Sequence, residues 1–164
     1  MKLESLKDLY LEQLKDLYSA ETQLVEALPK MAEAATARDL RQAFNEHLRQ
    51  TEEQVRRLER IFQDLGSSPK GHTCEGMKGL IKEGEEMIKM RGEPAVLDAG
   101  LIAAAQRVEH YEIAGYGTVR TYAELLGRDE HVSLLERTLQ EEEDTDERLT
   151  QLAESHVNEE ALVR

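Results

Sequence analysis

The sequence has little of what a disulfide-stabilised or membrane-spanning protein needs. Its 164 residues include one cysteine, three prolines, two phenylalanines and no tryptophan. The single Cys74 excludes an intrachain disulfide, which fits a reducing compartment. No apolar run approaches the roughly 20 residues of a transmembrane helix, and the opening MKLESLKDLY lacks the apolar core of a secretory signal. These absences predict a cytoplasmic protein that does not enter a membrane.

Positive charge is also scarce. The chain has 21 Lys and Arg against 34 Asp and Glu, which gives a formal net charge of -13. Because phosphate groups would be repelled, neither nucleic acid nor an anionic membrane is expected as a partner. The abundant residues are Leu, Ala, Glu, Lys and Arg, which are typical of helices, and the length suits one domain over residues 1–164.

Apolar periodicity and turn residues predict four long helices and one short one. Pro29 is expected to kink or split the first long helix, Gly127 to end the third, and Asp129 to cap the fourth. The predicted long helices are about Leu3–Thr36, Asp39–Leu65, Pro94–Gly127 and Asp129–His156, and the short amphipathic helix is about Glu75–Met90.

The connections between these helices predict the topology. Two tight turns join the long helices into two antiparallel hairpins, and a long crossover over residues 66–93 joins the hairpins. A single long crossover is the connectivity of ferritin-like bundles. We therefore predict an all-α, ferritin-like four-helix bundle, in which the short crossover helix covers an exposed face or forms an oligomer contact.

Acidic residues interrupt the apolar stripes of three predicted helices. Alternating steps of three and four residues place them where an apolar side chain is expected. A carboxylate on a buried face costs several kcal/mol unless another group compensates it. Five such acids therefore call for cations. They are Glu21 in the first helix, Glu109 and Glu112 in the third, and Glu142 and Asp146 in the fourth.

These acids are predicted to meet near the middle of the bundle. Residues equidistant from a tight turn lie opposite each other in an antiparallel hairpin, so sequence numbers alone give their levels. We took the two turns to lie near residues 37–38 and 127. The facing pairs are then Glu112 with Glu142, Glu109 with Asp146, and Glu21 with Gln54.

Carboxylates packed this closely either share protons or bind metal. Two divalent cations would offset most of the four or five negative charges, and carboxylate oxygens suit iron, manganese, magnesium or calcium. Ferritin-like di-iron and di-manganese sites also use a Glu-x-x-His motif on each of two helices. This chain contains no such motif. The metal prediction therefore depends on the carboxylates in the core.

Three neutral residues on inner faces each have two interpretations. His47 lies about two turns from the level of Glu21 and is either a satisfied core histidine or a metal ligand. Gln54 is either a ligand or a hydrogen-bond partner that orients Glu21. Tyr116 either packs in the core or bonds to groups around the metals. In the acidic run Glu141–Asp144, only the second residue lies on the stripe, and the others are expected to face solvent.

Several segments carry a family resemblance. YSAETQLVEALPKMAEAAT, LRQAFNEHLRQTEEQVRRLE, LIAAAQRVEHYEIAGYGTV and TLQEEEDTDERLTQLA resemble the YciE/YciF branch of the ferritin-like superfamily, and VEHYEIAGYGT is the most specific part. The resemblance covers nearly the whole chain. It implies a rubrerythrin-like four-helix bundle, a homodimer, a stress-response role and a dinuclear metal site, most often taken to be iron.

The resemblance also implies site residues. It carries over Glu21, Glu109, Glu112, Glu142 and Asp146 as metal ligands. His47 belongs to the same signature in the second helix, whereas Gln50 departs from it, because similar proteins often carry Glu there. This departure leaves only neutral donors on the second helix.

Together, the residues and the resemblance predict a ferritin-like metalloprotein with a carboxylate-rich dinuclear centre. The predicted metal is iron, with manganese or zinc as alternatives, and the predicted oxidant is oxygen or peroxide. The alternative is a non-enzymatic, metal-binding or stress-protective helical bundle. Whether the protein turns over a substrate is left open.

Overall fold

The computed structural model describes residues 2–162, and all of the regular structure in this range is helical. The predicted all-α class is therefore confirmed. None of the described helices is long and apolar enough to cross a membrane. The elements are α1 (Leu6–Ala34), α2 (Arg38–Leu65), α3 (Glu75–Lys89), α4 (Pro94–Leu125), α5 (Asp129–Leu152), a π-helical turn (Ala153–Val157) and α6 (Asn158–Leu162).

The helix ends follow local chemistry. Ser5 caps α1 by accepting a hydrogen bond from the backbone N–H of Asp8. Gly66 and Gly127, which follow α2 and α4, adopt the left-handed conformation that glycine permits, with φ of 61° and 67°. Gly127 thus terminates the third long helix, as the sequence predicts.

Pro29 does not split α1, which continues through it to Ala34, so of the two predicted outcomes only a kink is compatible with the structure. Two predicted details are corrected. Asp129 is the first helical residue of α5 and not its cap, because the capping position belongs to Arg128, which makes no side-chain capping bond. The α-helical part of the fourth long helix ends at Leu152, where the backbone widens into the π-helical turn.

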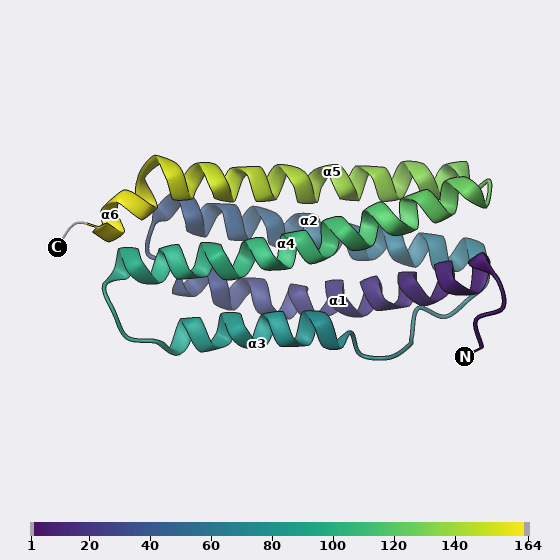
Figure 1. The fold of residues 1–164 in the computed structure, drawn as a ribbon, viewed down its shortest axis with the longest axis horizontal. Helices are drawn as coiled ribbons and strands as arrows, with labels where there is room; N and C mark the ends of the chain where they lie inside the picture. The colour runs from purple at the N-terminus through teal and green to yellow at the C-terminus, as the bar shows by residue number, and fades with distance from the viewer. Residues whose placement is uncertain (1, 163–164) are drawn as a thin grey trace.

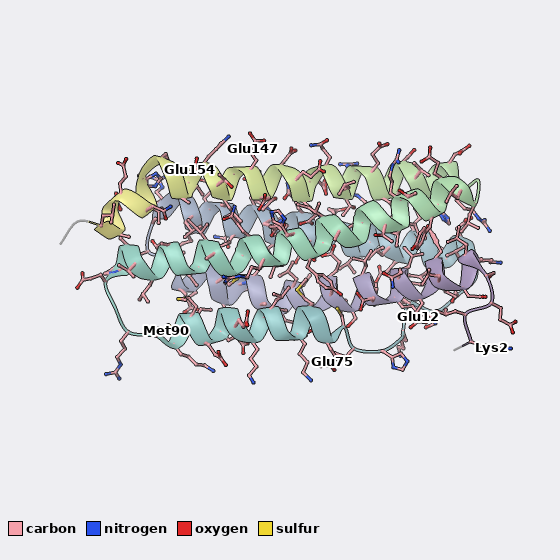
Figure 2. The ribbon with its side chains drawn as sticks, in the orientation of Figure 1. Lys2, Glu12, Glu75, Met90, Glu147 and Glu154 are labelled. Carbon is pink, nitrogen blue, oxygen red and sulfur yellow. The ribbon has the colours of Figure 1, made fainter. Side chains whose placement is uncertain are left out.

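The four long helices lie side by side, and α3 lies outside them against α1 and α4 (Figure 1). Tight turns join α1 to α2 and α4 to α5, and the connection that contains α3 joins the two hairpins. Charged side chains cover the exterior. The labelled Glu75, Glu147 and Glu154 point away from the helices (Figure 2), and all three are exposed. The acidic surface is thus separate from the acids in the interior.

The apolar core forms two layers separated by a polar centre. Along α1, one cluster contains Leu14 and Leu17, the other contains Leu24 and Leu28, and the buried Glu21 lies between them. The same order occurs along α2, where His47 and Gln54 lie between the apolar segments at its two ends. These layers separate the polar centre from solvent at both ends of the bundle.

A carboxylate from a third helix holds the turn between α1 and α2. The capping residue of α2, Ala37, has no polar side chain. Asp98 of α4, which is only 2% exposed, accepts hydrogen bonds from the backbone N–H groups of Thr36 at 2.8 Å and Ala37 at 2.7 Å. The first hairpin is thereby fixed against α4.

We predict that Asp98→Asn lowers the free energy of unfolding by about 1–3 kcal/mol, because an amide has one acceptor oxygen and leaves a backbone N–H unpaired. Urea unfolding followed by circular dichroism measures the loss. Asp39→Asn is the control: this exposed acid in the first turn of α2 interacts only with the helix dipole, which is worth about 0.3–1 kcal/mol. Equal losses in the two variants would contradict the capping role.

Candidate metal centre

Four helices direct polar side chains into the middle of the bundle, and each of these residues is at most 2% exposed. Helix periodicity explains the convergence, since residues three, four or seven positions apart share one face. The spacing is three between the two acids of α4 and seven between the two neutral residues of α2. The residues are Glu21 of α1, His47 and Gln54 of α2, Glu109 and Glu112 of α4, and Glu142 of α5.

The ionisable members of this set form two overlapping clusters. Ligand atoms of His47, Glu109 and Glu142 lie within 4.8 Å of one another, and so do ligand atoms of Glu21, Glu112 and Glu142. Each cluster could hold a metal ion. Glu142 belongs to both clusters, so its two oxygens are available to two ions.

Most ligand atoms in this centre have no hydrogen-bond partner. Folded proteins pair nearly all of their buried polar groups, so each exception needs a physical reason. With the carboxyls ionised, eight buried side-chain nitrogen or oxygen atoms of the described residues are unpartnered, and all eight belong to this centre. They are Glu21 Oε2, His47 Nε2, Gln54 Oε1, Glu109 Oε2, and both carboxylate oxygens of Glu112 and Glu142.

The distance between His47 and Glu109 is that expected of two side chains that bind one metal ion. Nε2 of His47 lies 2.9 Å from Oε1 of Glu109 and 3.7 Å from Oε2 of Glu142. Nε2 of His47 has no hydrogen-bond partner, so the shorter contact is not a hydrogen bond. Two donors that each lie about 2.1 Å from one ion, at a right angle, are about 3 Å apart. The distance therefore fits a pair of metal ligands.

Neighbouring side chains hold the other edge of this imidazole. Nδ1 of His47 lies 3.4 Å from Gln50 Oε1 and 3.4 Å from Thr145 Oγ1. Gln50 thus contacts the histidine through its side-chain oxygen. These contacts leave Nε2 facing the carboxylates.

Burial and mutual repulsion raise the pKa values of all four carboxyls. Loss of hydration raises the pKa of Glu21 to about 8, and the charge of Glu142 adds to the shift. Burial likewise raises the pKa of Glu109 to about 8. The pKa values of Glu112 and Glu142 lie well above the ordinary range, first because of burial and then because of neighbouring carboxylates. Without a cation, protons must neutralise much of this cluster at neutral pH.

Tyr116 bonds directly to one of the acids. Its hydroxyl donates to Oε1 of Glu21 at 2.5 Å, and both side chains are buried. Burial, followed by the charge of Glu21, raises the pKa of Tyr116. This contact favours the interpretation of Tyr116 as a hydrogen-bonding neighbour of the site. The bond uses Oε1 of Glu21 and leaves Oε2 without a partner.

The structure does not bring Asp146 into either cluster. Its side chain is 21% exposed, Oδ2 lies 3.1 Å from Nε2 of His110, and Gln106 donates to Oδ1 at 3.3 Å. Asp146 lies one turn after Glu142 on α5, but its carboxylate contacts Gln106 and His110 of α4 and not the cluster. The predicted level is confirmed, since Asp146 contacts residues on either side of Glu109 along α4, but the ligand atoms that lie beside Glu109 belong to His47 and Glu142.

Two supporting residues escaped the sequence prediction. Arg57, with a side chain only 10% exposed, donates to both carboxylate oxygens of Glu141 at 2.6 and 2.9 Å. Glu141 also accepts a hydrogen bond from Nε2 of Gln54 at 3.3 Å. The sequence pattern predicts instead that Glu141 faces solvent with the rest of its acidic run. The sequence feature that could have indicated this pair is Arg57 itself, a basic residue three positions after Gln54 and on the edge of the same helix face.

We predict that the metal-free protein loses stability as pH rises from about 4.5 to about 8. Over this window Glu21 and Glu109 keep their protons in the folded state, whereas the unfolded chain releases them near the ordinary value of 4.5. The unfolded state then binds fewer protons, so the free energy of unfolding falls with rising pH. Thermal unfolding in chelator at pH 5, 6, 7 and 8 measures this slope.

The control for this pH dependence is the double variant Glu21→Gln/Glu109→Gln, which removes the two titrating groups and keeps their size. Its unfolding temperature should depend less on pH than that of the unmodified protein. If both proteins show the same slope, the titration of these two carboxyls is not its cause.

Comparison with known proteins agrees with the predicted resemblance. The model of a domain of unknown function (DUF892) matches residues 5–162. Protein YciF of Escherichia coli strain K12 is 44% identical over 162 residues, which cover 98% of this chain and 98% of that protein.

Solved structures also match this fold. The crystal structure of the E. coli stress protein YciF has a TM-score of 0.91 at 44% identity and covers 95% of this chain and 99% of that one. YcfI of Rhodopseudomonas palustris, for which a structural role has been suggested, has a TM-score of 0.87 at 45% identity, with 91% and 95% covered. A protein from Xanthomonas campestris pv. campestris, at 19% identity and a TM-score of 0.75, shares the fold. This chain therefore belongs to the DUF892 family, within its YciF-like branch.

Proposed function

We propose that the protein is a ferritin-like metalloprotein in which the four long helices hold two divalent metal ions, with iron as the native metal. The observation that carries this proposal is the set of eight buried, unpartnered side-chain atoms gathered in one centre. Four carboxylates would balance the charge of two divalent ions, since the other two residues of the centre are neutral donors. Manganese and zinc are the alternative metals.

The two clusters suggest how the residues divide between the ions. His47, Glu109 and Glu142 would hold one ion, and Glu21, Glu112 and Glu142 would hold the other. Glu142 would then bridge the pair. We extend the same proposal to a cytoplasmic homodimer on the strength of the family resemblance.

Bound iron would supply one-electron chemistry toward oxygen or peroxide, so the proposed activity is oxidation of ferrous iron with either oxidant. The chain's own residues would orient and protect the centre. The apolar layers exclude bulk water, and Tyr116 keeps its proton on a hydroxyl oxygen that lies 2.5 Å from Oε1 of Glu21. The stress role named for E. coli YciF supports a protective activity of this kind.

A second candidate is a metal-binding bundle without turnover. The structural role suggested for YcfI of Rhodopseudomonas palustris favours it. In that case the ions would act only by neutralising the buried carboxylates, and metal would stabilise the folded state without consuming an oxidant. Turnover separates the two candidates. Peroxide consumption beyond one equivalent per bound metal supports the first, and full metal occupancy without it supports the second.

We predict that anaerobic titration with Fe(II) reaches about two ions per chain, as in other dinuclear carboxylate sites. Admission of oxygen should then change the optical absorption. Elemental analysis and ultraviolet–visible spectroscopy provide the measurements. Fewer than one tightly bound ion per chain would rule out the proposed metal centre.

We predict that Glu142→Gln loses most of this binding, because it removes the one carboxylate shared by both clusters. The metal-free variant should be at least as stable as the unmodified protein at pH 8, because one buried like charge is gone. Glu143→Gln is the matched control, since Glu143 follows on the same helix and is exposed. Equal metal binding in the two variants would contradict the bridging role.

A further inference from the structure

Arg57 and Glu141 form an ion pair between two helices, and this pair accepts a hydrogen bond from the amide nitrogen of Gln54 through Glu141. Nε2 of Gln54 donates to Oε1 of Glu141 at 3.3 Å, and Arg57 donates two hydrogen bonds to the same carboxylate. Arg57 lies on α2 with Gln54, and Glu141 lies on the facing α5. The side chains of the pair are only 10% and 19% exposed, so solvent competes weakly for these bonds.

This pair fixes which end of the amide faces inward. An ionised carboxylate only accepts hydrogen bonds, so Glu141 selects the NH2 group of Gln54 and turns the carbonyl oxygen away from itself. That oxygen is fully buried and unpartnered. Gln54 also lies two helical turns after His47, on the same face of α2, and near the level of Glu21 in the first hairpin.

An unpartnered buried carbonyl is costly, and a bound cation removes that cost. The two clusters differ in whether they contain a neutral donor. His47 gives its cluster a neutral donor, whereas the cluster of Glu21, Glu112 and Glu142 contains carboxylates alone. The free Oε1 of Gln54 would supply a neutral donor to this second cluster.

Building on the proposed function, we infer that Gln54 Oε1 is a metal ligand on the Glu21 side of the centre, which makes the two metal positions chemically unequal. One position contains an imidazole, and the other is built from oxygen atoms alone. Imidazole suits zinc and iron, whereas carboxylate and carbonyl oxygens suit harder ions such as manganese. Arg57 and Glu141 are positioning residues, which act by orienting the amide of Gln54.

The test loads the metal-free full-length protein first with one equivalent of Zn2+ per chain and then with Mn2+. Zinc should occupy the imidazole position, and electron paramagnetic resonance should report Mn2+ bound at the oxygen position. Gln54→Leu should weaken Mn2+ binding at least about tenfold and leave the affinity for the first Zn2+ unchanged. Gln63→Leu, the same change at an exposed position of α2, should alter neither affinity.

A second variant tests the positioning pair without leaving an unpaired buried charge. Arg57→Leu/Glu141→Leu removes both partners, and it should weaken Mn2+ binding by about 10- to 100-fold and change the Mn2+ resonance line shape. The first Zn2+ should bind as before. An equal loss for both metals would assign the pair a merely structural role and overturn its part in the inference.

The outcomes separate this inference from the proposed function. Two bound ions per chain, with Mn2+ held as tightly by Gln54→Leu as by the unmodified protein, would overturn the role of Gln54 and leave the metal centre intact. Binding of neither metal to the unmodified protein would overturn the metal centre and, with it, the inference.

Discussion

The burial of four carboxylates in a water-poor interior is the constraint on which the rest of this structure depends. Their proximity and burial raise all four pKa values, so the centre needs either protons or cations. The length of the bundle follows from this need. Each long helix must carry an apolar segment on both sides of the polar centre, as α1 does with Leu17 before Glu21 and Leu24 after it. A shorter bundle would leave one side of the centre open to water.

Around the centre, contacts behind the potential ligands orient them in advance. Tyr116 bonds one oxygen of Glu21, Gln50 and Thr145 lie against the far nitrogen of His47, and Glu141 holds the amide of Gln54. In each residue these contacts leave one ligand atom unpartnered. In the proposed centre, four carboxylates would neutralise two divalent ions, whereas two trivalent ions would require further negative charge.

The helices and the acids could be predicted from the sequence, because both depend on periodicity along single helices. Apolar stripes gave the long helices to within a few residues at most ends, and placed Glu21, Glu109, Glu112 and Glu142 on inner faces. Prediction was weaker where helices meet. Level arithmetic ignores side-chain length, so it left the role of His47 open, and it ignores the direction of each side chain, so it grouped Asp146 with the ligands. The pairing of Arg57 with Glu141 requires knowing which edges of α2 and α5 face each other, and one sequence does not supply this.

The fold tolerates far more change in sequence than the proposed metal centre would. The Xanthomonas campestris protein keeps the fold at 19% identity, which is understandable because many combinations of apolar side chains can fill the two core layers. The chemistry of the proposed centre would depend on a few positions, several of them on α2. Its inner face offers only neutral donors at His47 and Gln54, with Gln50 behind the histidine. A carboxylate at any of these positions would add a buried negative charge and change the ions that the centre can neutralise, while leaving the apolar layers, and hence the fold, as they are.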